Sequence, residues 1–516
     1  MKALLMHTDR DFDVKAALPS NAAELTQDLE IETLLAAMAG EDIFLLEVAK
    51  RAIFTSLREP EEILYRQHVL VDCLEHADVV REMYGIAVEA IERERRVWSA
   101  VIGRYPEALL HRSVEVLDIF ASLLERLKNI AEEHGAKFRS DGFTRLFGML
   151  SGELSHAYLD TVREHMRRLK HQDNVLMSLQ LGQGNKGIHP ILHKPRIAGP
   201  WWIEKLQSWK DRLSSDDSSS YVYQIDDRDE NGFKALSELK GQGISMAASS
   251  MAQSTDHILS FFRMLRVELA FYIGCLNLRD QLVQKGEPIC FPEPLSGTRM
   301  MFATRGLYDI CLSLNLEGRA VGNDVSGDEK TLVMITGANR GGKSTFLRSV
   351  GLAQLMMQCG MFVAAESFRA NVCNGIYTHF KREEDKTMRS GKLDEELGRM
   401  STIVDCLVPS SMVLFNESFA STNEREGSEI ARQIVRALLE SGMKVFYVTH
   451  MFDLAHGFYN AKMDGTLFLR AERLADGERT FRLIEAEPLP TSYGADLYQR
   501  IFGEVAEPSI ETLPRA

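Results

Sequence analysis

The sequence predicts two structural parts: an all-α region over residues 1–287 and a mostly parallel α/β domain over residues 288–516. Three observations predict this division. Apolar residues recur at three- and four-residue spacing through much of the first half, which is typical of packed helices. From Pro288, short apolar runs alternate with helical segments, which is typical of a parallel sheet covered by helices. A glycine-rich segment lies between one of these runs and the helix that follows it.

The composition is that of a globular protein. The chain has 516 residues, 45% of them hydrophobic and 26% charged, which excludes bulk disorder and collagen. A formal net charge of −14 argues against a uniformly basic nucleic-acid-binding surface but not against a local basic patch. The 7 cysteines form no CxxC pair, which predicts free thiols in a reducing compartment. We find neither a signal peptide nor the ~20 apolar residues of a membrane span. We therefore expect a cytoplasmic protein without a membrane association.

Helical spacing and turn residues define the elements of the first half. We expect helices over residues 29–101, 107–134, 154–172 and 244–284. Glycines and prolines interrupt the pattern between residues 182 and 200. A polar, acidic and serine-rich stretch then predicts a flexible loop near residues 209–243. Long helices with so few turn signals favour a bundle or arms, with the last helix packing back on the earlier ones.

Three short apolar runs of the second half predict strands of one sheet: Leu332–Thr336, Met412–Phe415 and Val445–Thr449. The first run is followed by Gly337-Ala338-Asn339-Arg340-Gly341-Gly342-Lys343-Ser344, which matches G-x-x-x-x-G-K-[ST] in full. Glycines let backbone N–H groups approach phosphate oxygens, and the N-terminus of the next helix adds positive potential. We expect Lys343, partly exposed, to reach the β- and γ-phosphates of ATP, and the Ser344 hydroxyl to ligate Mg²⁺.

Polar residues follow the other two strands. Asn416 stands where a P-loop enzyme usually has the Mg²⁺-side aspartate, and Glu417 is placed to orient the attacking water. Because an amide adds no negative charge, we expect Asn416 to weaken Mg²⁺ binding. His450 ends the third strand, at the edge where open α/β sheets bind ligands. A γ-phosphate sensor is the functional interpretation of His450, and a structural histidine is the alternative. For Glu417 the alternative is a solvated carboxylate at a strand end.

These residues resemble the ATPase domain of the MutS family. The resemblance is carried by segments with the family's order and spacing: Asn323-Asp324, the P-loop continuing through Thr345 to Arg348, Asn416-Glu417, Thr422–Gly427, Val448-Thr449-His450 and Thr491–Gly494. It extends over residues 306–503. The helical half is similar, less closely, to the family's core, lever and clamp region.

The resemblance implies an ABC-like homodimer that holds ATP between its protomers. It implies that residues 337–345 and Asn416 bind nucleotide and Mg²⁺ in one protomer. Thr422 to Gly427 of the partner would close over the γ-phosphate, and a helical segment at the C-terminal end would take part in dimerisation. Glu396 fits a helical glutamate that the family places before its second strand.

The chain departs from the family's pattern in three places. Asn416 replaces an acidic residue, and Ser418-Phe419-Ala420 replaces a turn that contains glycine. The chain also has no room for the mismatch-reading and connector domains that precede the core in repair members.

DNA contact is a further expectation. Helical spacing places Arg163, Arg167 and Lys170 on neighbouring turns, where they could meet phosphates without reading sequence. An ordinary solvated helix face is the alternative. Arg93, Arg95 and Arg96 alternate with glutamates, which favours a solvated face there.

Two functions follow from these expectations. The first is a DNA-associated ATPase that moves helical arms as a clamp on DNA, recognising structure rather than sequence. The alternative is a nucleotide-gated dimer with weak or no hydrolysis that presents its arms to an unknown protein partner.

Overall fold

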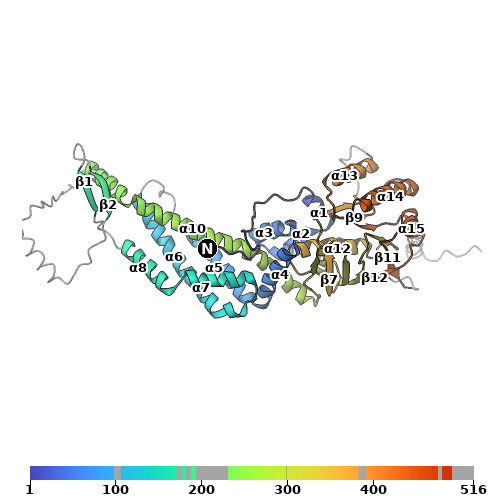
Figure 1. Cartoon of the computed structure of the whole chain (residues 1–516), viewed down its shortest axis with the longest axis horizontal. Helices are drawn as coiled ribbons and strands as arrows, with labels where there is room; N and C mark the ends of the chain where they lie inside the picture. The colour runs from blue at the N-terminus through green and yellow to red at the C-terminus, as the bar shows by residue number, and fades with distance from the viewer. Residues whose placement is uncertain are drawn as a thin grey trace, which may run out of the picture. The chain divides into compact units, whose positions relative to one another are not determined.

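The computed structural model describes residues 1–97, 106–170, 177–181, 187–192, 230–297, 299–382, 391–474 and 479–490 (Figure 1). Contacts divide the chain into two compact units. Unit 1 comprises Met1–Ala3, Glu82–Lys137 and Arg145–Arg266, and unit 2 comprises Leu4–Arg81, Phe138–Thr144 and Val267–Ala516. The N-terminal helices up to Arg81 therefore belong to the same unit as the α/β part. The expected division into domains at residues 287 and 288 remains a prediction.

Unit 1 is mainly helical, as expected. Its helices include the C-terminal part of α5 (Ala77–Arg96), α6 (Pro106–His134), α8 (His156–Lys170) and the first part of α10 (Glu230–Gln284). Val114 and Leu117 of α6 pack with Met166 of α8 in a small apolar core. Helix α7 (Asp141–Glu153) precedes α8, and the short 3₁₀ helix η2 (Gly135–Lys137) follows α6.

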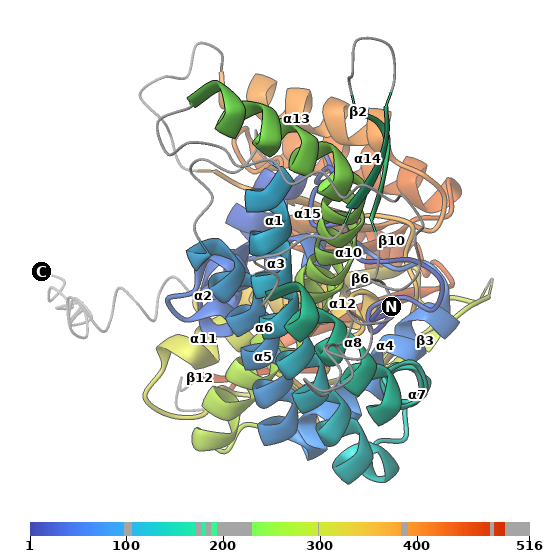
Figure 2. The same ribbon diagram turned by 90° about the vertical axis from the view of Figure 1, so that its left-hand side faces the viewer.

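Two features of unit 1 differ from the expectation. Strands β1 (Met177–Leu181) and β2 (Gly187–Leu192) form an antiparallel hairpin that the glycine and proline signals did not predict. Helix α10 begins at Glu230, so the C-terminal part of the loop predicted near residues 209–243 is helical, while residues 209–229 lie outside the described residues. Gly241 and Gly243 account for the error, since glycine weakens a helix signal although a long helix tolerates it. Figure 2 shows α10 as one continuous helix.

The main sheet of unit 2 has the strand order β12-β11-β6-β10-β9-β8. Its strands are β6 (Leu332–Thr336), β8 (Ile376–Phe380), β9 (Met412–Asn416), β10 (Lys444–Val448), β11 (Thr466–Arg473) and β12 (Arg479–Glu485). All neighbouring pairs are parallel except β11–β12. This confirms the expected α/β part, and the three predicted strands match β6, β9 and β10 to within a residue or so. Parallel strands place their carboxyl ends at one edge, so the residues after β6, β9 and β10 meet there.

Helices connect these strands: α12 (Lys343–Gln358), α13 (Lys392–Cys406), α14 (Glu424–Glu440) and α15 (Phe452–Asn460). Every residue of β6 and β10 is buried, as expected for strands covered on both faces. A second, four-stranded sheet has the order β3-β7-β4-β5 and consists of β3 (Glu293–Leu295), β4 (Phe302–Leu307), β5 (Asn323–Ser326) and β7 (Ser367–Asn371). The remaining helices of unit 2 are α1 (Ala22–Asp28), α2 (Ile31–Ala39), α3 (Ile43–Phe54), α4 (Pro60–Glu75) and α11 (Ile310–Asn315).

The N-terminal segment is held inside unit 2 by buried charged groups. Glu268 of α10 accepts hydrogen bonds from the backbone N–H groups of Leu5, Met6 and Phe12. The guanidinium of Arg66 in α4 is fully buried and donates to Met6 O at 3.1 Å and to Cys359 O at 3.0 Å. Cys359 ends the helix that begins at Lys343. Arg66 therefore links the N-terminal segment to the far end of the P-loop helix.

All seven cysteines lie in the described residues and are free thiols. Cys406 alone is exposed, Cys290 is half-buried and the other five are buried. Burial raises the pKa of Cys359 and of Cys373 to about 12 and that of Cys290 to about 11. Within the part of the chain that the structure describes, no helix is both long and apolar enough to cross a membrane.

Candidate nucleotide-binding site

The glycine-rich loop between β6 and α12 requires glycine where φ is positive and where another part of the chain lies very close. Gly337 and Gly342 have φ values of +109° and +88°, which side chains rarely adopt. A Cβ atom on Gly341 would lie 2.7 Å from the Cβ of Ala471 and 2.9 Å from Ala338 O. The loop is therefore held close against β11, with its turn directed to the carboxyl edge of the sheet.

Lys343 is the first residue of α12 and is buried, with 5% of its surface exposed. Its ammonium donates to Gly337 O at 3.0 Å and to Ala338 O at 2.9 Å. Burial lowers the pKa of Lys343, and the nearby Glu417 carboxylate acts in the opposite direction. The expectation of a partly exposed lysine is wrong, because the loop wraps around the ammonium and supplies carbonyl acceptors.

Ser344 and Asn416 meet at the carboxyl ends of β6 and β9. The Ser344 hydroxyl donates to Asn416 Oδ1 at 2.9 Å. Neighbouring ligands of an octahedral Mg²⁺ at 2.0–2.1 Å are about 3 Å apart, so the two oxygens fit adjacent corners of such a site. Both groups are neutral. Among the described residues, no three His, Cys, Asp or Glu side chains gather as a metal site, so a nucleotide would have to supply the missing charge.

Glu417 follows Asn416 in a left-handed conformation, with φ of +54°. Its backbone N–H donates to Val448 O at 2.9 Å, which ties it to the end of β10. His450 Nδ1 lies 3.7 Å from Glu417 Oε2. His450 lowers the pKa of Glu417 most, and the positive charges of Lys343 and Lys381 lower it further against the effect of burial. The carboxylate is therefore ionised at neutral pH and can accept a proton.

The turn after Glu417 is built without glycine. Phe419 adopts φ of +61° and its side chain is fully buried. The Tyr447 hydroxyl donates to Ser418 O at 2.8 Å. A Cβ on Gly427 would lie 2.3 Å from Phe419 O, so the turn and the start of α14 fit only with glycine there. The replacement of the family's glycine turn is thus accommodated by buried contacts.

The segment from Thr422 to Gly427 caps α14. Asn423 accepts a hydrogen bond from Glu426 N at 2.9 Å, and Thr422 donates to Glu426 Oε2 at 2.6 Å. Glu424 Oε1 accepts from Phe452 N at 2.7 Å, which joins this cap to the helix that follows His450. The cap is rigid and polar. The roles of Thr422 and Gly427 toward a partner's nucleotide remain predictions.

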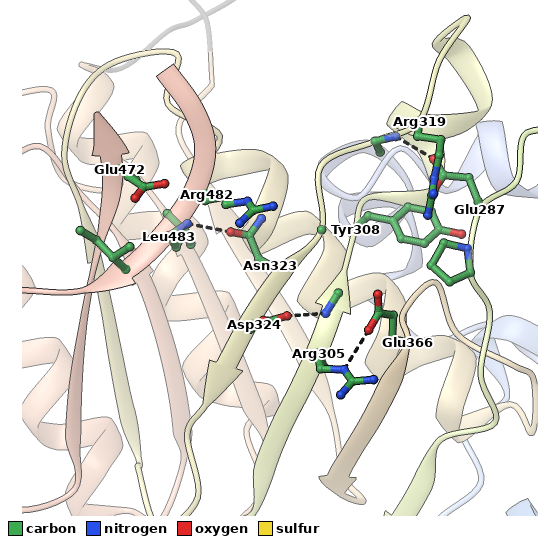
Figure 3. A pocket seen from close by; sticks show the side chains of 15 residues that line it. Glu287, Arg305, Tyr308, Arg319, Asn323, Asp324, Glu366, Glu472, Arg482 and Leu483 are labelled. Carbon is green, nitrogen blue, oxygen red and sulfur yellow. Dashed lines mark hydrogen bonds and ion pairs between the residues drawn. The ribbon is translucent and has the colours of Figure 1, made fainter. Parts of the chain in front are cut away.

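A pocket of about 410 Å³ lies between β4, β5 and β12, and no residue of the glycine-rich loop lines it (Figure 3). Asn323 orders its wall, because Oδ1 accepts from Leu483 N at 2.7 Å and Nδ2 donates to Phe481 O at 3.4 Å. A Cβ on Gly342 would lie 3.1 Å from the same Phe481 O, so β12 passes close to the P-loop. Charged side chains line it, including Arg305, Arg319, Glu366, Glu472 and Arg482. The sequence signalled only Asn323-Asp324, since charged residues scattered over strands and loops resemble a solvated face.

The buried side chains of Glu396 and His379 lie near the turn after Glu417, and only Glu396 was expected from the sequence. Glu396 of α13 matches the helical glutamate implied by the resemblance, is 2% exposed and accepts from Ser421 Oγ at 2.9 Å. His379 of β8 is fully buried and lies against Ser418. A single histidine in an apolar strand gives no signal in the sequence.

The three basic residues predicted to meet DNA from α8 are Arg163, Arg167 and Lys170, and they differ in their surroundings. Arg163 forms an ion pair with Glu125 of α6, with Nη1 3.2 Å from Oε1. Arg167 is exposed, while the side chain of Lys170 lies outside the described residues. Arg93 pairs with Glu89 at 2.8 Å and Arg96 with Glu92 at 3.5 Å, in line with a solvated face. The predicted motif Thr491–Gly494 and the C-terminal segment also lie outside the described residues.

Comparison with known proteins places two family domains on the chain. The MutS2 N-terminal domain matches residues 58–285, and MutS domain V, a P-loop ATPase domain, matches residues 333–502. The MutS2 match begins at residue 58, just before α4 in unit 2, continues through the helices of unit 1 and ends at residue 285, again in unit 2.

Individual relatives align over shorter stretches. The DNA mismatch repair protein MutS of Thermotoga maritima is 37% identical over 135 residues, which is 26% of this chain and 17% of that protein. The endonuclease MutS2 of Thermus thermophilus is 33% identical over 151 residues, or 28% of this chain and 20% of that protein. The DNA mismatch repair protein MutS of Lactobacillus helveticus is 26% identical over 275 residues, or 49% and 31%. The chain thus spans less than a third of the length of each of these relatives. The domain matches and these relatives together show that the chain belongs to the MutS family and that its 516 residues do not contain the mismatch-recognition domain.

Proposed function

We propose that this chain is a DNA-associated ATPase that binds ATP and Mg²⁺ at the carboxyl edge of its main sheet. One observation carries the proposal. Lys343 and Ser344 from the P-loop helix meet Asn416 and Glu417 from β9 at this edge, with Ser344 Oγ 2.9 Å from Asn416 Oδ1. That is the set of groups that phosphoryl transfer from ATP to water needs: phosphate charge neutralisation, a metal ligand and a base.

Each residue has a distinct task in this proposal. Lys343 exchanges its carbonyl acceptors for phosphate oxygens when nucleotide binds. Ser344 and Asn416 would hold Mg²⁺, which would supply neutralisation of phosphate charge. Glu417, ionised at neutral pH, accepts a proton from the attacking water, and His450, 3.7 Å away, contacts the γ-phosphate.

We further propose that the site is completed by a second copy of the chain in an ABC-like homodimer. The polar cap from Thr422 to Gly427 would close over the partner's γ-phosphate, and the segment after residue 490 would contribute to dimerisation. Residues 1–287 would then act as core, lever and clamp, with α10 carrying movement into the arms. DNA would be held by structure rather than by sequence, with the exposed Arg167 of α8 meeting phosphate.

The test combines hydrolysis with DNA binding. ATP turnover is measured for wild type, Lys343→Ala and Glu417→Gln, with Val48→Ala in α3 as a control that lies in a buried core. We expect turnover in wild type and in the control, and none in the other two. Filter binding to branched, mismatched and plain duplex DNA, with and without ATP, then tests the association. Absence of DNA binding at low salt would contradict it.

The alternative function is a nucleotide-gated interaction protein with weak or no hydrolysis. The neutral Ser344–Asn416 pair favours it, because this pair brings no negative charge to Mg²⁺. ATP binding by wild type without measurable turnover, and without DNA binding, would select this alternative.

A further inference from the structure

His379 lies directly behind the turn that carries Glu417. In the parallel pair of β8 and β9, His379 is the register neighbour of Phe415, and Phe380 is the neighbour of Asn416. The His379 ring is fully buried and stacks on Phe419, with centroids 5.1 Å apart and planes at 18°. The ring therefore contacts the turn from within the buried core.

Both ring nitrogens are engaged. Nε2 lies 2.9 Å from the backbone oxygen of Glu396, and Nδ1 lies 2.7 Å from the hydroxyl of Ser418. A backbone carbonyl can only accept, so the hydrogen of a neutral ring must be on Nε2. Nδ1 is then an acceptor, and the Ser418 hydroxyl, which also donates to the backbone oxygen of His379, is shared between these two acceptors. The ring thus bridges α13 to the residue that follows Glu417.

Other contacts hold the same turn. Tyr447 donates to Ser418 O at 2.8 Å, and Ser421 donates to Glu396 Oε1 at 2.9 Å. Helix α13 therefore holds the turn through two hydrogen bonds. The backbone oxygen of Glu396 accepts from the His379 ring, and the Glu396 carboxylate accepts from Ser421. Glu417 and Phe419 both have positive φ, so the turn needs such support to persist.

We propose that His379 is a positioning residue for Glu417. The neutral ring contacts both α13 and Ser418. These contacts fix the left-handed backbone conformation that directs the Glu417 carboxylate into the site. This inference rests on the proposed hydrolysis for its kinetic consequence, but the positioning of the turn can be measured without turnover.

The surroundings keep the ring neutral. Burial lowers the pKa of His379 to about 4, and the positive charges of Arg399 and Arg382 contribute to the shift. Glu396 lies on the α13 side, and the Tyr447 hydroxyl lies on the β10 side. The hydrogen-bond pattern described above therefore holds throughout the neutral pH range.

The experiment compares four variants in the full chain. His379→Phe keeps an aromatic ring for stacking but loses both ring hydrogen bonds, and Ser418→Ala removes the hydroxyl that contacts Nδ1 and the backbone oxygen of His379. His379→Gln has one donor and one acceptor, as the neutral ring does. Val48→Ala, buried in α3, lowers stability without touching the turn. The kcat and KM for ATP, the Tm, and the hydrogen exchange of backbone amides in residues 417–421 are measured for each.

We expect His379→Phe and Ser418→Ala to lower kcat roughly tenfold to a hundredfold, the scale at which small misplacements act, with KM nearly unchanged. The loss in the double variant should be smaller than the product of the two single losses, because both variants remove the contact between the ring and Ser418. His379→Gln should keep most of the activity. Amides 417–421 should exchange faster in the first two variants, and Val48→Ala should change Tm alone.

The outcomes separate this inference from the proposed function. A kcat of His379→Phe within twofold of wild type, with unchanged exchange at 417–421, would overturn the positioning role. If wild type hydrolyses no ATP, the proposed function fails, and the exchange measurement decides alone. Faster exchange in His379→Phe then supports positioning of the turn, and unchanged exchange contradicts it.

Discussion

Asn416 places a neutral amide, rather than a charged carboxylate, beside the expected Mg²⁺ position of the P-loop site. Its Oδ1 accepts from Ser344 at 2.9 Å, so it faces the place where Mg²⁺ would be bound. An aspartate at this position would add a full negative charge to the same geometry. The sequence predicted this position correctly as a polar strand end, but its orientation toward Ser344 depends on the register between β9 and β10.

We therefore expect Asn416→Asp to lower the Mg²⁺ concentration that gives half-maximal ATP turnover. The reason is the added charge beside the metal, which an amide oxygen does not supply. The measurement is a Mg²⁺ titration of ATPase activity for wild type, Asn416→Asp and Glu417→Gln. Unchanged Mg²⁺ dependence in Asn416→Asp, with an inactive Glu417→Gln, would show that Asn416 does not limit metal binding.

Lys343 has a structural task besides its expected one. Its ammonium satisfies Gly337 O and Ala338 O inside the loop. We expect Lys343→Ala to lose ATP binding and to lower the free energy of unfolding by about 1–3 kcal/mol, because two carbonyls lose a buried donor. Equilibrium binding and chemical denaturation measure the two effects. Unchanged ATP affinity in the folded variant would contradict the P-loop assignment.

The buried charges around the N-terminal segment make this element sensitive to pH. Burial raises the pKa of Glu268 from 4.5 to about 7, so between these values the folded protein holds a proton that the unfolded chain releases. Stability from this group therefore falls as pH rises from 4.5 to 7. Burial and Arg66 lower the pKa of His7 from 6.5 to about 3, so stability from His7 falls as pH decreases from 6.5 to 3. Between pH 4.5 and 6.5 the two effects offset each other.

We expect the variant His7→Phe to reveal the pH dependence of stability that comes from Glu268. The variant keeps the stacking of ring 7 on Phe12 but removes the titrating nitrogen. Its free energy of unfolding should fall with rising pH between 4.5 and 7, by at most about 1.4 kcal/mol per pH unit. Urea denaturation at several pH values measures this slope, with His68→Phe on the exposed face of α4 as the control. Equal slopes in the variant and wild type would contradict the assigned proton states.

Elements were predictable from the sequence where one local signal dominated. The β-branched and apolar runs of β6, β9 and β10 and the motif at Gly337–Ser344 were sufficient. The hairpin β1–β2 was not, because a proline within a strand and flanking glycines resemble a loop. His379 was also missed, since its role comes from register with Phe415 and contact with α13, and neither is visible along the chain.

At the scale of the whole molecule, nucleotide should act as part of the contact between two copies. The cap from Thr422 to Gly427 is polar and ordered by its own hydrogen bonds, so it loses little freedom on meeting a phosphate. We expect a slowly hydrolysed ATP analogue to strengthen the association of Glu417→Gln protein. Sedimentation with and without the analogue measures the association constants. Identical constants would contradict a composite site.

The distribution of thiols has a practical consequence for such measurements. Cys406 is exposed at the end of α13, while the other six are buried or half-buried. A maleimide dye should therefore label the native protein at one position, without any cysteine being replaced. That position is on the helix that holds both His379 and Ser421 in place. Fluorescence from one natural reporter could thus follow how α13 responds to nucleotide in real time.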